Sequence, residues 1–434
     1  MNFAEKHPFF LTRTGSLVLH SGLAVAGACS AAMFPALNWS LLAWIALLPL
    51  ILLCRFCSVR SAFLRGLTWG YFWSLFSFLW LREIALPIPF ILSFVLALFV
   101  AAWSAYYNFL WRHLSIAPAD RLEGGAHCAE LAPFRRPLNG ILFMLANAGM
   151  WCVLEWLRGW IMTGLPWDYL GTSQWRNLPL IQICEFTGVF GVSFLVAAVN
   201  LGAGLALISF CGGVRGQTYR RPWPLLTAFA LLLACYVSGL HLLRVNRLDE
   251  TAVRYVNIGV IQPDLSQRRN AGYAAAKEAL DVCTDLTERL LDRDEKLRNL
   301  VPVGNAPNRK LDLIVWPETA VPYAYRGGAE LSQEYRDRIG AMLWRHRIPF
   351  LIGSIDFQVP EDSPENYKVF NAALLITEPG GSVKDFFYKY HRVPFGEYVP
   401  FGDTFPKLNE LVGMGRNLTA GRRCNPLEAR TLQR

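Results

Sequence analysis

Charged residues are scarce in this sequence. Asp, Glu, Lys and Arg make up 17% of the 434 residues, whereas hydrophobic residues make up 53%. Soluble domains carry about 25% charged residues, so this deficit indicates a membrane protein. The formal net charge of +9 could indicate a nucleic-acid-binding protein, but the positive residues are placed as a membrane topology signal, as described below.

A disulfide framework and a metal-binding pattern are also missing. The ten cysteines are scattered, mostly in apolar segments, which is typical of small buried side chains. Cys54 and Cys57 form a single C-x-x-C, but no His or second C-x-x-C accompanies them, so a core role is favoured over a metal or redox role. No cleavable signal peptide is evident, and the first apolar run is predicted to be a retained span.

Long apolar runs fill the first 245 residues. A helix needs about 20 mostly apolar residues to cross the hydrocarbon core of a bilayer. Seven segments approach this length, although the second is short: 16–34, 39–54, 63–80, 87–111, 139–157, 188–210 and 224–243. The sequence thus predicts a membrane domain, residues 1–245, with about seven transmembrane helices.

Lys and Arg gather in alternate loops of this domain. One set of loops and span edges carries Lys6, Arg13, Arg55, Arg60, Arg65, Arg112, Arg121, Arg135, Arg136, Arg215, Arg220 and Arg221. The other set carries only Arg82, Arg158 and Arg176. Because Lys and Arg favour cytoplasmic loops, we expect a cytoplasmic N-terminus. Seven spans would then place the rest of the chain on the extracytoplasmic side.

One loop, 155–187, is too polar for a span and too apolar for a solvated loop. It carries four tryptophans, at 156, 160, 167 and 175, and a Gly-Leu-Pro break. These features predict an interfacial or re-entrant element with indole rings at headgroup depth. Two interpretations stay open: an aromatic belt alone, or the lining of a lipid-binding site.

The pattern changes after residue 250, and residues 251–434 are predicted to form a separate α/β domain. Apolar strand-like runs alternate with amphipathic helical runs, which indicates layered α/β packing. We predict strands at 254–263, 311–317, 349–357, 369–378 and 382–390, and helices at 272–299 and 329–346.

Three polar residues of this domain are candidates for catalysis. Glu318 follows an apolar strand, where functional groups gather in α/β folds, and a carboxylate there can act as a general base. Lys389 ends an aromatic strand and could stabilise an oxyanion, and Glu397 lies in a rigid Pro- and Gly-containing loop. The alternatives are a solvated glutamate that opens a helix and a surface lysine.

A Glu and a Lys together suit a nucleophilic cysteine, whose proton the carboxylate accepts. The α/β domain contains two cysteines. Cys283 lies on the apolar face of a predicted helix, and Cys424 lies in a basic, coil-like segment. Neither has the strand-end position that this role requires.

The chain resembles the apolipoprotein N-acyltransferases, bacterial inner-membrane enzymes with a nitrilase-like αββα domain. The resemblance covers essentially the whole chain. Its most specific segments, in order, are EWLRGWIMTGLPW (155–167), GVFGVSFLVAAVN (188–200), IGVIQPDLSQ (258–267), LIVWPETAVP (313–322) and KYHRVPFGEYVPF (389–401).

The resemblance implies a role for four residues. Glu318 and Lys389 match the general base and the lysine of a Glu-Lys-Cys triad, Glu397 matches a supporting glutamate, and Trp167 matches a tryptophan near the lipid site. The implied reaction moves an acyl chain from a phospholipid to the enzyme cysteine, as a thioester. The chain then passes to the amino group of the diacylglyceryl-cysteine that begins a lipoprotein. The implied location is the inner membrane, with the catalytic domain in the periplasm. The resemblance implies no metal and no cofactor.

The sequence departs from the family pattern at the nucleophile. The family cysteine lies in an I-C-Y-E motif some tens of residues after F-G-E-[FY]-V-P, and residues 401–434 contain no such motif. We therefore expect a chain truncated before its nucleophile, with an incomplete α/β domain and no ability to form the acyl-enzyme. Two other functions stay open: a membrane-tethered amidase or hydrolase of the nitrilase type, and a non-catalytic lipid-binding membrane protein.

Overall fold

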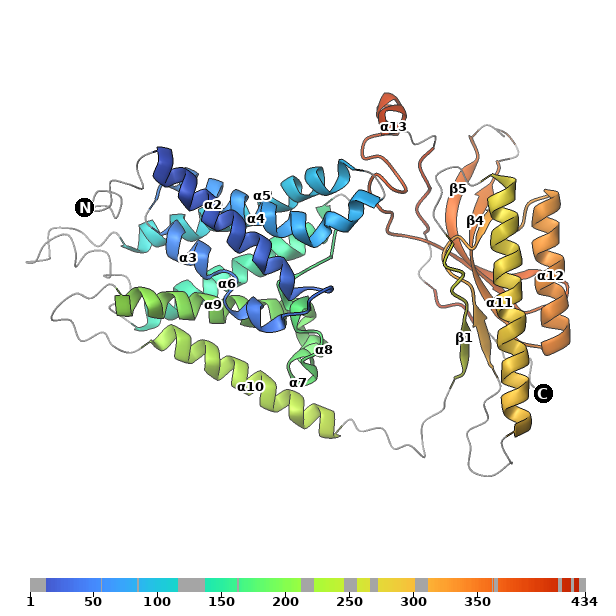
Figure 1. Cartoon of the computed structure of the whole chain (residues 1–434), viewed down its shortest axis with the longest axis horizontal. Helices are drawn as coiled ribbons and strands as arrows, with labels where there is room; N and C mark the ends of the chain where they lie inside the picture. Colours follow the sequence, from blue (N-terminus) through green and yellow to red (C-terminus); the bar gives the residue numbers. More distant parts are fainter. Residues whose placement is uncertain are drawn as a thin grey trace, which may run out of the picture. The chain divides into compact units, whose positions relative to one another are not determined.

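The computed structural model of the chain divides into two compact units, Met1–Arg247 and Leu248–Arg434 (Figure 1). Each unit is described by itself. The described residues are 13–55, 57–83, 86–115, 137–161, 164–211, 222–245, 256–265, 272–300, 311–360, 362, 366–412, 416–422 and 425–428. Several residues of the predicted loops lie outside these ranges, namely Lys6, Arg121, Arg135, Arg136, Arg215, Arg220 and Arg221.

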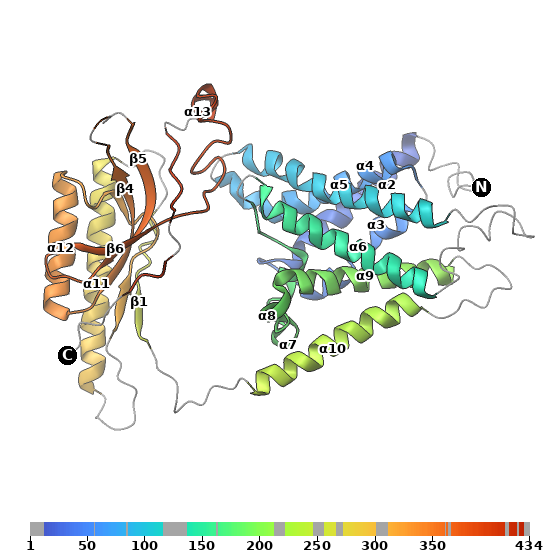
Figure 2. The same cartoon turned by 180° about the vertical axis from the view of Figure 1, so that it is seen from behind.

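The first unit is a bundle of helices. Its long helices are α2 (Arg13–Ser30), α4 (Val59–Phe78), α5 (Ile88–Ser115), α6 (Pro137–Arg158), α9 (Val189–Cys211) and α10 (Trp223–Val245). Shorter elements connect them: η2 (Ala31–Met33), η3 (Ser40–Trp44), α3 (Leu48–Cys54), η4 (Leu79–Glu83), η8 (Leu170–Gln174), α7 (Leu178–Ile181) and α8 (Cys184–Thr187). The start of α2 and the end of α10 lie at opposite ends of the bundle (Figures 1 and 2).

Five helices of the described residues are long and apolar enough to cross a membrane. They are Thr14–Met33, Ile88–His113, Pro137–Arg158, Val189–Phe210 and Trp223–Val245. Of the seven predicted segments, 39–54 and 63–80 do not meet this criterion within the described residues. Helix α4 is 20 residues long, but Arg60 and Arg65 lower its hydropathy. Segment 39–54 forms no single helix, because η3 ends at Trp44 and α3 begins only at Leu48.

Segment 39–54 nevertheless runs between the two ends of the bundle. At its start, Gln174 of η8 donates a hydrogen bond to the Ser40 carbonyl, 2.8 Å away. In its middle, Asn200 of α9 accepts from the Leu47 amide at 2.9 Å. Just past its end, Asn108 of α5 donates to the Cys57 carbonyl at 3.0 Å. These side chains satisfy backbone groups that the broken helix leaves unpaired.

The second unit contains one six-stranded sheet. Its strands are β1 (Ile258–Val260), β2 (Leu313–Val315), β3 (Val321–Ala324), β4 (Phe350–Gln358), β5 (Lys368–Ile376) and β6 (Val383–Tyr388). The order is β1-β2-β4-β5-β6, with β3 beside β4. Strands β1, β2 and β4 are parallel, whereas β5 and β6 are antiparallel to their neighbours. All five predicted strands are present, and the sequence missed β3 and the short helix α13 (Lys407–Val412).

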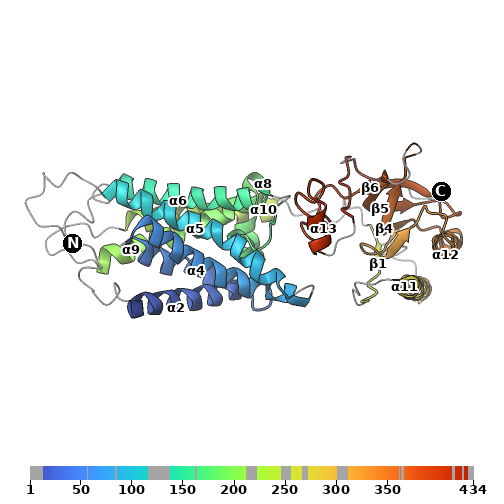
Figure 3. The same ribbon diagram turned by 90° about the horizontal axis from the view of Figure 1, so that it is seen from above.

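Helices α11 (Tyr273–Leu300) and α12 (Glu330–His346) lie beside each other along the sheet (Figures 1 and 3). Their apolar faces and alternate residues of the strands form one core, so that Cys283, Ile339 and Leu374 are all fully buried. The chain thus has the predicted combination of a helical membrane-type bundle and an α/β unit. The described part of the α/β unit has a single sheet.

Candidate active site

Glu318 follows strand β2, as the sequence predicted. The Trp316 indole lies in the core and donates to the Thr287 hydroxyl at 3.0 Å, which fixes the end of the strand. Pro317 then turns the chain, and Thr319 has a left-handed φ of 57°. The Glu318 side chain remains 62% exposed. The strand end therefore presents this carboxylate to solvent.

Gly353 of β4 allows the chain around Glu318 to lie close to the sheet. A Cβ atom at this position would meet the Pro317 carbonyl oxygen at 2.3 Å and the Glu318 Cα at 2.6 Å. Real Cβ atoms do not approach other atoms so closely, so only glycine fits without a shift of the backbone. No feature of the sequence around Gly353 distinguishes this glycine from the others.

Lys389 directly follows β6, and its backbone extends the pairing with β5. Its amide donates to the Asn371 carbonyl at 2.9 Å, and its carbonyl accepts from the Gly421 amide at 2.9 Å. With the backbone held on both sides, the side chain points to the two predicted glutamates. Nζ lies 2.7 Å from Glu397 Oε1 and 3.3 Å from Glu318 Oε1.

Glu397 is held by its own loop. Its Oε2 accepts from the Val393 amide at 2.9 Å, and its backbone carbonyl accepts from the Leu418 amide at 2.7 Å. The side chain is only 12% exposed. Phe395, two residues earlier, has a left-handed φ of 60°, a strained conformation for a bulky residue. The loop therefore fixes Glu397 in one orientation.

Asn371 completes the cluster, and sequence reasoning missed it. Its Nδ2 donates to Glu318 Oε1 and to Glu397 Oε1, the second at 3.1 Å. Asn371 lies on β5 and is 9% exposed. The one available signal was a lone amide inside the apolar strand VFNAALLI, where a buried polar side chain needs a partner.

The charges around Lys389 determine its protonation state. Burial lowers the pKa of Lys389, but hydrogen bonds and charge attraction from Glu397 and Glu318 raise it by more, and the net result is a raised pKa. Lys389 is therefore a fixed cation at neutral pH, suited to stabilise negative charge rather than to remove a proton. The exposed Glu318 carboxylate is the group placed to accept one.

A second polar network supports the end of β6. The Tyr388 hydroxyl donates to Asp356 Oδ2 at 2.5 Å, and Arg326 forms an ion pair with the same carboxylate. Arg326 also donates to the Tyr388 hydroxyl at 2.7 Å. Burial, and then Asp356, raise the pKa of Tyr388 to about 12, so that its hydroxyl stays protonated as a donor. Because Tyr388 precedes Lys389, this network fixes the strand end that presents the lysine.

The two cysteines of the α/β unit do not join the cluster. Cys283 lies on α11 and is fully buried in the core, as predicted. Burial raises its pKa to about 11. A protonated, buried thiol is a poor nucleophile. Cys424 lies outside the described residues. In the described ranges, no group of three His, Cys, Asp or Glu side chains could hold a metal ion.

Trp167, the predicted lipid-site residue, belongs to the bundle. Its ring lies 6.2 Å from that of Phe78, centroid to centroid, and 5.7 Å from that of Trp80. The side chain is 44% exposed. Within its unit, Trp167 therefore forms part of an aromatic group at the end of α4.

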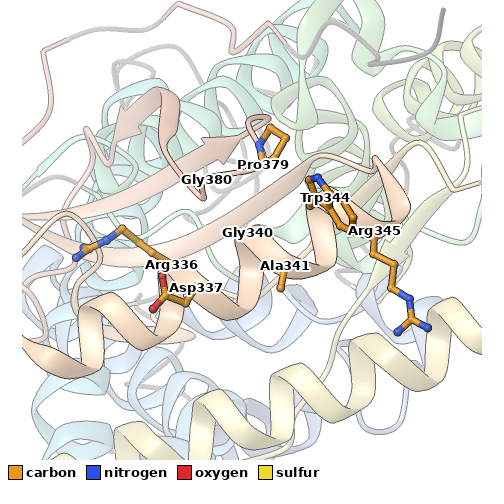
Figure 4. A pocket seen from close by; sticks show the side chains of 8 residues that line it. All are labelled: Arg336, Asp337, Gly340, Ala341, Trp344, Arg345, Pro379 and Gly380. Carbon is orange, nitrogen blue, oxygen red and sulfur yellow. The ribbon is translucent and has the colours of Figure 1, made fainter.

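A groove of about 480 Å³ lies elsewhere on the α/β unit, between α12 and the turn after β5 (Figure 4). Its lining comprises Arg336, Asp337, Gly340, Ala341, Trp344, Arg345, Pro379 and Gly380. None of these residues belongs to the Glu318–Lys389 cluster, so the groove is not part of this site.

The fold and the cluster define a class: a multi-pass membrane protein with an α/β domain that carries a Glu-Lys-Glu site. Comparison with known proteins shows a similarity to one family. Residues 26–202 match the model of the apolipoprotein N-acyltransferase N-terminal domain. The chain is therefore related to the apolipoprotein N-acyltransferases, as its motifs predicted.

Individual relatives agree with this relationship. The apolipoprotein N-acyltransferase of Geobacter metallireducens is 28% identical over 397 residues, which cover 90% of this chain and 67% of the relative. That of Chlorobaculum tepidum is 27% identical over 418 residues, 93% of this chain and 67% of the relative. That of Azotobacter vinelandii is 32% identical over 267 residues, 61% of this chain and 44% of the relative. The chain thus spans about two thirds of the length of the first two.

Proposed function

We propose that this protein acts in the N-acylation of lipoproteins. An acyl chain is taken from a phospholipid and transferred to the α-amino group of a diacylglyceryl-cysteine. The observation that supports the proposal is the cluster of Glu318, Lys389, Glu397 and Asn371, which lies on strand β5 and near the ends of strands β2 and β6. Its attachment to a bundle with five apolar helices brings this chemistry to a bilayer, where a phospholipid donor resides.

Each charged residue has a role in this proposal. Glu318 accepts the proton of a cysteine thiol, whose sulfur attacks the ester carbonyl of the phospholipid. Lys389 stabilises the negative charge that develops on the carbonyl oxygen. Collapse of the intermediate breaks the ester bond, Glu318 returns the proton to the leaving glycerol oxygen, and the products are a lysophospholipid and a thioester. Glu397 and Asn371 hold the lysine and the base in place.

The second step regenerates the thiol. The lipoprotein amine attacks the thioester carbonyl and gives a proton to Glu318. The carbon–sulfur bond then breaks, Glu318 passes the proton to the sulfur, and the products are an amide and the free thiol. Lys389 serves the second oxyanion as it served the first. Neither step of the proposed reaction requires an oxidant, a reductant or a metal. Trp167, with Phe78 and Trp80, is proposed to contact the acyl chains of bound lipid.

We also propose the location and orientation. The relatives and the apolar helices suit the bacterial inner membrane, and the excess of Lys and Arg in one set of loops favours a cytoplasmic N-terminus. Because α2 starts and α10 ends at opposite ends of the bundle, the α/β unit would follow on the periplasmic side.

The nucleophile is proposed to be a cysteine of an I-C-Y-E motif, and residues 1–434 contain no such motif. The buried Cys283 is unsuited to replace it. Residues 1–434 alone are therefore expected to form no acyl-enzyme. Intact-mass measurement after incubation with phospholipid tests this, and an acyl adduct on Cys283 or Cys424 would refute it.

The function is tested on the gene product that contains these residues. It is purified and supplied with a phospholipid that bears a labelled acyl chain, with or without a diacylglyceryl lipopeptide. Acyl transfer predicts labelled amide on the lipopeptide and an equal amount of lysophospholipid. Free fatty acid formed without acceptor would instead indicate a membrane-tethered hydrolase. Lipid binding without any product from a protein that carries I-C-Y-E would indicate a non-catalytic lipid-binding protein.

A further inference from the structure

Two charged side chains are buried at the end of helix α6 in the bundle. Glu155 is 5% exposed and Arg158 is 6% exposed. Burial of charged groups in an apolar bundle is costly unless their polar atoms are paired. We therefore ask which polar atoms of Glu155 and Arg158 have hydrogen-bond partners and which do not.

Part of their hydrogen-bonding capacity goes to the chain that follows the helix. Glu155 Oε1 accepts from the Trp151 indole at 2.8 Å and from the Leu170 amide at 2.7 Å. Arg158 Nη2 donates to the Trp167 carbonyl at 2.9 Å, and the guanidinium lies over the Tyr169 ring at 4.8 Å. The two residues thus fasten the segment 164–170 to α6.

Glu155 and Arg158 also line a small cavity. A cavity of about 20 Å³ lies between α4, α5 and α6, and Trp73, Glu155 and Arg158 are among its lining residues. Each of the three has one buried polar atom with no hydrogen-bond partner among the described residues: Trp73 Nε1, Glu155 Oε2 and Arg158 Nε. Apolar side chains, such as Leu96 and Val100, complete the lining.

We propose that this cavity is a binding site for one ordered water molecule. The water donates a hydrogen bond to Glu155 Oε2 and accepts one each from Trp73 Nε1 and Arg158 Nε. The assignment satisfies all three buried atoms with one donated and two accepted bonds, which a water molecule can make. A buried water usually makes about three hydrogen bonds and needs only some 10–15 Å³ of space.

The water joins α4 to the end of α6. Trp73 lies on α4, five residues before Phe78, whose ring lies near that of Trp167. The segment 164–170 is then held from both helices: through Glu155 and Arg158 on one side, and through the water and Trp73 on the other. The site does not depend on the proposed acyl transfer, because it concerns the bundle alone.

The direct test is a structure of the purified protein at a resolution that shows ordered water. Density within hydrogen-bond distance of Trp73 Nε1, Glu155 Oε2 and Arg158 Nε supports the proposal. A dry cavity, or density that contacts only one of the three atoms, overturns it.

A pair of matched variants gives an independent test. Trp73→Phe and Trp69→Phe each remove a buried indole from the same Trp–Trp pair, whose centroids are 5.4 Å apart. Trp69 Nε1 also has no partner among the described residues, but Trp69 does not line the cavity. Trp73→Phe should therefore lower the midpoint of thermal unfolding by about 2–4 °C more than Trp69→Phe. Equal effects would contradict the water bridge.

Discussion

Lys389 Nζ lies 2.7 Å from Glu397 Oε1, closer than the 3.3 Å that separates it from Glu318 Oε1. The lysine is thus anchored by the buried glutamate rather than by the exposed one. The Glu397 carboxylate accepts hydrogen bonds from Lys389, from Asn371 and from its own loop, whereas the Glu318 side chain remains 62% exposed. This asymmetry separates a fixed cation from a carboxylate that can exchange a proton.

The asymmetry predicts unequal effects on the pKa of Lys389. Glu397→Gln should lower this pKa more than Glu318→Gln, because the closer and less exposed carboxylate contributes more. The rate of Lys389 acylation by a water-soluble anhydride, followed by mass spectrometry against pH, measures it, and the exposed Lys384 serves as an internal reference. Equal shifts in the two variants would contradict the assignment.

The same raised pKa has a stability consequence with a definite sign. A lysine whose folded pKa lies above its unfolded value of about 10.4 stabilises the fold fully below that value. The contribution is lost as pH rises through the folded pKa. As pH rises through the alkaline range, the wild type should therefore lose stability relative to Glu397→Gln, which thermal unfolding at a series of pH values would show.

Asn371→Ala should reduce acyl transfer. The variant removes a donor shared by Glu318 and Glu397, and a hydrogen bond to a charged group is worth about 1.5–3 kcal/mol. We expect kcat to fall about 10- to 100-fold with little change in the KM for phospholipid. Asn409→Ala is the control, since the Asn409 side-chain amide donates to the Gly402 carbonyl and not to a residue of the cluster. An unchanged kcat would remove Asn371 from the site.

Gly353→Ala should displace Glu318. The added Cβ would overlap the Pro317 carbonyl and the Glu318 backbone, so the turn after β2 must shift. We expect a large loss of acyl transfer, and a loss of stability of about 1–3 kcal/mol. Gly380→Ala is matched to it, because a Cβ at Gly380 meets no atom within 4 Å. If both variants transfer acyl chains at the same rate, the close approach at Gly353 is not needed.

The orientation of the bundle can be tested with reporters. Alkaline phosphatase, active only outside the cytoplasm, should be active when fused after Val245 and inactive when fused after Phe210. A fluorescent protein that matures only in the cytoplasm should give the reverse pattern. The opposite result at both positions would place the α/β unit in the cytoplasm.

The charged residues that the sequence singled out lie together in the structure, and their selection has a physical reason. Glu318 and Lys389 are charged residues at the ends of apolar strands. Burial of a charged side chain costs free energy, so a charge placed next to a buried strand indicates a specific role. Asn371 and Gly353 were missed because their roles depend on pairing between β4 and β5 and on the path after β2. No local pattern reveals those long-range relationships.

The errors in the bundle have a similar origin. Segment 39–54 was predicted as a helix from its apolar composition, but its backbone is divided at residues 45–47. The side chains of Asn200, Asn108 and Gln174, more than 50 residues away in the sequence, supply the missing hydrogen bonds. The apolar composition of segment 39–54 predicted that it lies within the bundle, but not that its helix is interrupted.

The most direct test of the account is the destination of the acyl chain. The gene product that contains these residues is given phospholipid with a labelled acyl chain and a diacylglyceryl lipopeptide. Mass spectrometry then locates the label. The account predicts an amide at the lipopeptide α-amino group, in an amount equal to the lysophospholipid, and loss of both products in Glu318→Gln. Label found as free fatty acid, or transfer undiminished in Glu318→Gln, would contradict it.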